Sequence, residues 1–141
     1  MRMKALFVGG VLALVAIVSA PASAHHSFAA EFDADKPITL TGIVTKVEWT
    51  NPHVWFYVNV KDEATGKVTN WGAEMGPPHG LQRSGWRRET LKIGEEVSID
   101  GFLARNGANR INARTVTLTA TGGRPGQTLD ANSSSAGANQ N

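Results

Sequence analysis

The sequence contains no cysteine. A disulfide framework, a thiolate metal site and a thiol nucleophile are therefore excluded, and packing alone must hold the fold together. The sequence also lacks a nucleophile elbow and a phosphate-binding glycine loop, two of the common enzyme motifs. We therefore expect a non-enzymatic protein, although the sequence leaves the enzymatic class open.

A strong excess of charge is also lacking. The formal net charge is +2, from 14 basic and 12 acidic side chains. Two of the basic residues, Arg2 and Lys4, lie at the extreme N-terminus. Without them the chain is neutral, so nothing in its composition indicates binding to nucleic acid.

No apolar run is long enough to span a bilayer comfortably, which takes about 20 residues. The longest run, Ala5 to Val18, follows a basic start and precedes Ala22-Ser23-Ala24. These are the three parts of a secretory signal peptide, so we expect residues 1–24 to be removed by cleavage between Ala24 and His25. The expected product is exported and has no stable membrane insertion. An uncleaved membrane anchor is the alternative.

What the chain does have is period-two apolar alternation, which is typical of β-strands. The expected strands are residues 38–49, 54–60, 68–75, 96–105 and 110–118, with a short helix or turn at residues 81–86. The apolar parity changes at Gly42, which predicts a β-bulge that bends the first strand there.

The strand order predicts an all-β fold, a small five-stranded Greek-key barrel of the OB type with a short helical insert. A flattened β-sandwich is the alternative. We expect an extended N-terminal arm at residues 25–36 and the barrel at residues 37–120. Residues 121–141 are rich in Gly, Ser, Ala and Asn, which predicts a disordered tail.

Several motifs of the chain resemble those of an exported bacterial family, catalogued as domain of unknown function 6152. The motifs are His25-His26-Ser27-Phe28, the run from Gly42 to His53, the Gly85-Trp86 pair and Leu91-Lys92-Ile93-Gly94. The resemblance extends from His25 to about Leu118. It implies a periplasmic or secreted bacterial protein with an OB-like core, and it implies no activity or catalytic residues.

Cleavage after Ala24 would give His25 a free α-amine. That amine and the His25 imidazole can chelate one metal ion, and a third nitrogen from another histidine would complete a histidine brace for copper or another late divalent metal. His53, in an Asn-Pro-His loop, is the preferred third ligand, and His26 and His79 are weaker candidates. The alternative is that these histidines are structural or solvated.

Aromatic and basic side chains suggest a second kind of site. Trp55 and Tyr57 fall on the face of their strand opposite its valines. On an OB barrel this face commonly binds oligonucleotides or oligosaccharides. The predicted site comprises these two rings together with Arg83, Arg87 and Arg88. It would bind a small ligand or an exported protein partner without a metal, unless the rings and arginines are only structural.

Overall fold

The computed structural model describes residues 28–121 and 123–131. The expected signal peptide and the two histidines that follow it, His25 and His26, lie outside these residues, so export and cleavage remain predictions. Within the described part, no helix is both long and apolar enough to cross a membrane.

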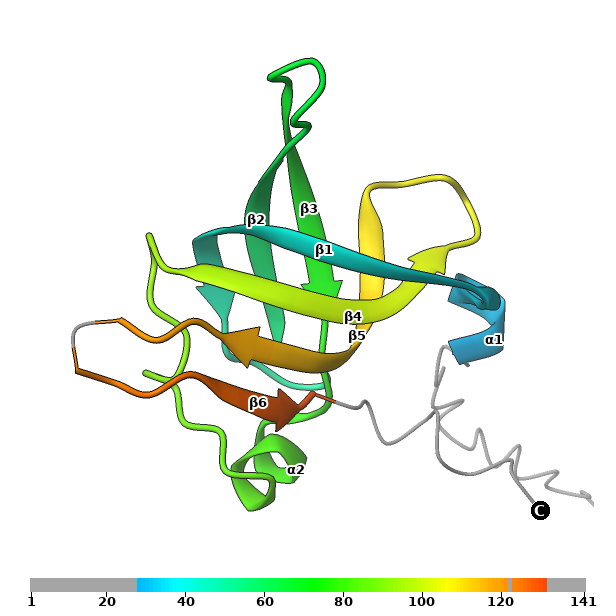
Figure 1. Ribbon diagram of the computed structural model, residues 1–141. Coiled ribbons are helices and arrows are strands. Elements are labelled where there is room, and N and C mark those ends of the chain that lie inside the picture. The colour runs from blue at the N-terminus through cyan, green and yellow to red at the C-terminus, as the bar shows by residue number, and fades with distance from the viewer. Residues whose placement is uncertain (1–27, 122, 132–141) are drawn as a thin grey trace, which may run out of the picture.

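The described chain consists mainly of strands (Figure 1). In order, the elements are α1 (Phe28–Glu31), β1 (Phe32–Glu48), β2 (Trp55–Lys61), β3 (Val68–Glu74), α2 (Pro78–Arg83), β4 (Glu96–Ala104), β5 (Arg110–Leu118) and β6 (Gln127–Asp130). The five expected strands and the short helical insert are all present. The fold is therefore all-β, as the alternation predicted.

The strands form one curved sheet in the order β3-β2-β1-β4-β5-β6, and β3 also pairs with β5. All neighbours are antiparallel except β3 and β5, whose parallel pairing aligns Gly72 with Arg110. This extra pairing closes five strands into a ring, which is visible in Figure 1. Closure confirms the OB-like barrel over the flattened sandwich, because a sandwich leaves two separate sheets.

The core lies inside this ring. Phe56, Val58, Val97, Ile99 and Val116 are completely buried and come from β2, β4 and β5. Burial of each such side chain contributes about 1.5–3 kcal/mol, so packing can hold the barrel without disulfides.

The bend in β1 lies later than the sequence predicted. The register between β1 and β2 shifts between Val44 and Lys46, and Ile43 is 40% exposed. Gly42 has a different role, because a Cβ atom there would lie 2.7 Å from the carbonyl oxygen of Asn59. The glycine permits a close approach of the two strands, and the bulge follows it.

The structure also corrects the predictions for the segments on either side of the barrel. The predicted extended arm is helical at Phe28–Glu31, and Phe32 is already a buried residue of β1 paired with Ala104. Beyond Ala120, in the predicted disordered tail, β6 pairs with β5 and buries Leu129. The low apolar content of this stretch was misleading, because two buried side chains, Leu129 and Ala131, join its described part to the core. Residues 132–141 lie outside the described part.

Candidate functional site

His53 lies in the loop between β1 and β2 and contacts a carboxylate at this end of the barrel. Its Nδ1 atom lies 2.7 Å from Oε1 of Glu74, the last residue of β3. Backbone hydrogen bonds from Val54 to Gly76 and from Met75 to Val54 hold the histidine loop against the end of β3. The backbone hydrogen bonds therefore hold the loop in place, and the Glu74 carboxyl group orients the His53 imidazole.

Glu74 is buried, with only 5% of its surface exposed, although its side chain is ionisable. The pKa of its carboxyl group is raised from 4.5 to about 7, mainly by burial and also by the nearby Glu31 carboxylate, while Arg110 opposes the shift. A carboxyl group that titrates near neutral pH beside an imidazole is typical of functional sites.

The shift predicts a pH-dependent stability that Glu74→Gln should abolish. Because the folded pKa is raised, the stabilising contribution of the neutral carboxyl is complete below about pH 4.5 and disappears as the pH rises through about 7. Relative to Glu74→Gln, the wild-type free energy of unfolding should fall by about 2–3 kcal/mol between pH 5 and pH 8. Urea titrations of both proteins across this range measure the difference, and a constant difference would contradict the assignment.

The first described residues of the chain lie at the same end of the barrel. The backbone amide and Nε of Arg105 donate to the carbonyl oxygens of Glu31 and Ala29, which anchors α1 beside the end of β4 (Figure 1). Glu31 is also close enough to Glu74 to raise its pKa. The N-terminal segment therefore enters the fold near the His53–Glu74 pair.

His79 is placed differently from His53. It is an exposed residue of α2, and its Nε2 atom lies 2.8 Å from Nη1 of Arg83. Among residues 28–121 and 123–131, no three His, Cys, Asp or Glu side chains form a group that could hold a metal ion. His25 and His26, the other predicted ligands, lie before Phe28 and outside the described residues.

Trp55 and Tyr57 lie on the outer face of β2, as predicted. They border a depression of about 310 Å³, together with Glu48, Asn70, Gly72, Asn109 and Arg110. A Cβ atom on Gly72 would lie 3.3 Å from the Tyr57 ring, so the glycine keeps the space between the two rings open. The Tyr57 hydroxyl donates to Glu48 at 3.2 Å.

The predicted arginines do not line this depression. Arg83 contacts His79, and Arg87 donates to the carbonyl oxygens of Gln82 and Trp86. The exposed Arg88 also lies outside its lining. The cation present is Arg110, whose guanidinium carbon lies 4.6 Å from the centre of a Trp55 ring.

Arg110 lies at the depression in place of the predicted arginines because of how the strands pair in the tertiary structure. The parallel pairing of β3 with β5 brings Arg110 next to Gly72, whereas α2 follows the end of β3. A sequence signal for Arg110 did exist, because it begins the strand after the Asn106-Gly107 turn, but nothing in the sequence pairs that strand with β3.

A family model matches residues 12–113, and its description is a family of unknown function, DUF6152. The chain belongs to this family. A search of curated proteins finds no match to the chain. The DUF6152 match includes the His53–Glu74 pair and the depression beside Trp55, and it ends inside β5, one residue before Arg114.

Proposed function

We propose that this DUF6152 protein is an exported, non-enzymatic binding protein that holds copper, or another late divalent metal, through His25 and His53. The observation that carries the proposal is the 2.7 Å contact between His53 Nδ1 and Glu74. A metal-bound histidine usually donates its second ring N–H to a carboxylate, which fixes the ring and makes the ligating nitrogen more basic. Glu74 is placed to serve this purpose, which leaves Nε2 as the ligating atom.

The position of α1 supplies the second support. His25 precedes Phe28, the first residue of α1, by a segment that can extend roughly 10 Å. Because α1 lies near Glu74, that reach is compatible with a chelate between the His25 amine, its imidazole and His53. Imidazole and amine nitrogen suit copper, which has the highest affinity in the divalent series.

The test is a copper(II) titration of the mature chain that begins at His25. We expect His53→Ala, or an added Gly-Ser before His25, to weaken copper binding at least about 100-fold, because each removes a nitrogen ligand. His79→Ala is the matched control and should bind like the wild type, since His79 contacts Arg83 on α2. Equal affinity in all four proteins would refute the proposal.

The second candidate function is metal-independent binding of an oligosaccharide or a similar ligand at the depression beside Trp55. Its support is the combination of two aromatic rings with hydrogen-bonding side chains on the face that OB barrels commonly use. Maltohexaose should change the tryptophan fluorescence, and Tyr57→Ala should weaken that response about tenfold. This function would be contradicted if maltohexaose left the fluorescence unchanged, or changed it only when copper was added.

A further inference from the structure

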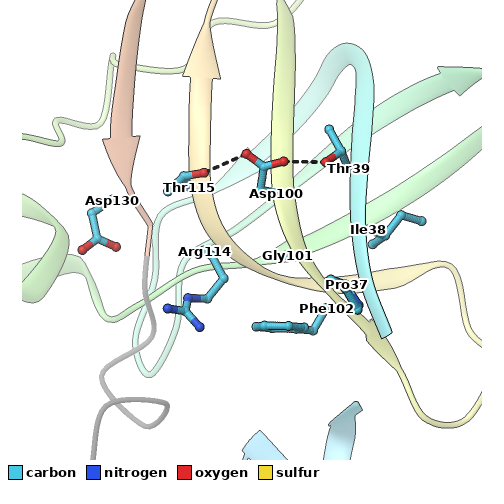
Figure 2. Close-up of a pocket in the computed structure, with 9 residues that line it drawn as sticks. All are labelled: Pro37, Ile38, Thr39, Asp100, Gly101, Phe102, Arg114, Thr115 and Asp130. Atoms are coloured by element: carbon cyan, nitrogen blue, oxygen red, sulfur yellow. Dashed lines mark hydrogen bonds between the residues drawn. The ribbon is translucent and has the colours of Figure 1, made fainter. Parts of the chain in front are cut away.

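A cavity larger than the depression beside Trp55 lies on the outer face of β1, β4, β5 and β6, and it shares no lining residue with either candidate site. Its volume is about 550 Å³, within the range of about 300–1,000 Å³ that is usual for small-molecule sites. Figure 2 shows its lining residues, which are Pro37, Ile38, Thr39, Asp100, Gly101, Phe102, Arg114, Thr115 and Asp130.

Strand register builds one polar row across this surface. Thr39 is paired with Asp100, Asp100 with Thr115, and Thr115 with Asp130. Directly paired residues share a face of the sheet, so all four side chains face the cavity. The hydroxyls of Thr39 and Thr115 donate to different oxygens of Asp100, at 2.5 and 3.1 Å, which fixes its carboxylate (Figure 2).

A β-bulge adds a cation beside this row. Asp100 is paired with Thr115 but Gly101 with Ala113, so Arg114 is the additional residue on β5. Bulges redirect side chains, and here Arg114 and Thr115 both line the cavity. The Arg114 guanidinium lies 5.6 Å from the Phe102 ring and takes part in no ion pair between residues that the structure describes.

One wall of the cavity is apolar. Gly101 lines the cavity with its backbone alone, because a Cβ atom there would lie 2.2 Å from the carbonyl oxygen of Asn112 on the neighbouring strand. Pro37 is paired with Phe102, two residues from the polar row along each strand, so both rings lie on the same face as Thr39 and Asp100. Ile38 borders the cavity, but its side chain packs against the barrel core.

From this arrangement we infer that the cavity binds a free α-amino acid with an apolar or aromatic side chain. Arg114 would hold the carboxylate in its planar fork. Asp100 would accept hydrogen bonds from the ammonium group, and Phe102 with Pro37 would contact the side chain. A zwitterion complements this lining, because one guanidinium and two carboxylates face the same space.

The test uses L-phenylalanine and two analogues that each lack one charge: L-phenylalaninamide without the carboxylate, and N-acetyl-L-phenylalanine without the ammonium. Binding is followed by the amide chemical shifts of Gly101, Phe102 and Thr115. Against wild-type protein we expect both analogues to bind at least about tenfold more weakly than the amino acid. Arg114→Gln should weaken the binding of L-phenylalanine by a similar factor but should leave the binding of phenylalaninamide unchanged.

Asp100→Asn tests the other charged group. It should remove the preference for L-phenylalanine over N-acetyl-L-phenylalanine, which lacks the ammonium group. Arg88→Gln, which changes an exposed arginine outside the cavity, should bind L-phenylalanine like the wild type. Equal affinity for all three ligands, equal loss in Arg88→Gln and Arg114→Gln, or no shift at about 10 mM amino acid would overturn the inference. The analogue comparison uses wild-type protein only, so it stands even where a variant fails to fold.

Discussion

Gly101→Ala is expected to destabilise the barrel by about 3–5 kcal/mol, a large fraction of the stability of an ordinary domain. A methyl group at this position would lie 2.2 Å from the carbonyl oxygen of Asn112 and 3.2 Å from the Cα of Ala113. Both neighbours are backbone atoms of β5, so relief requires the β4–β5 ladder to separate where the register shifts. Urea denaturation at constant pH measures the loss.

Gly80→Ala is the matched control for this substitution. Gly80 lies inside α2, and its added Cβ would make an ordinary contact of 3.5 Å with Pro77. Alanine at a helical position should stabilise the protein by about 0.5–1 kcal/mol. If both variants changed stability in the same direction and by a similar amount, the steric reason for Gly101 would be wrong.

Trp86→Ala should cost about 3–5 kcal/mol, because it removes the largest of the fully buried side chains. The ring also holds β6 in place, since its Nε1 donates to the carbonyl oxygen of Asp130 at 2.7 Å. Loss of the ring should therefore detach β6 from β5 in addition to leaving a cavity. Hydrogen exchange of the β6 amides, together with urea denaturation, tests both consequences.

Trp86→Phe separates the contribution of the buried ring from that of the hydrogen bond to Asp130. It retains most of the apolar volume but leaves the Asp130 carbonyl without the indole donor, at a cost of about 1–3 kcal/mol. The β6 amides should exchange faster than in the wild type, although the loss of overall stability should be smaller than in Trp86→Ala. Unchanged exchange in both tryptophan variants would show that β6 does not depend on Trp86.

The link from Trp86 to Asp130 also concerns binding. Asp130 lines the cavity on the outer face, so displacement of β6 would alter one of its walls. Arg114 and Gly101 lie on β5 and β4 and keep their own pairing. We therefore expect Trp86→Phe to retain the preference for an amino acid over its amide.

The sequence determined the elements of this fold because their signals are local. Alternating apolar residues gave the five barrel strands, and the placement of Trp55 and Tyr57 on the outer side of β2 followed from period-two geometry. His53 was selected because it lies in a loop at the end of the predicted barrel, and such loops commonly carry function. Short-range patterns contain this information without any knowledge of distant residues.

Only the tertiary structure decided which side chains meet. The contact of His53 with Glu74, the position of Arg110 over Trp55 and the bulge that exposes Arg114 each depend on pairing between strands far apart in the sequence. β6 was missed for the same reason: its buried Leu129 is paired with Val116 of β5, and its Asp130 carbonyl accepts a hydrogen bond from Trp86. Neither partner is visible within the stretch itself. Local composition therefore specified the strands, whereas ring closure and register determined the candidate sites.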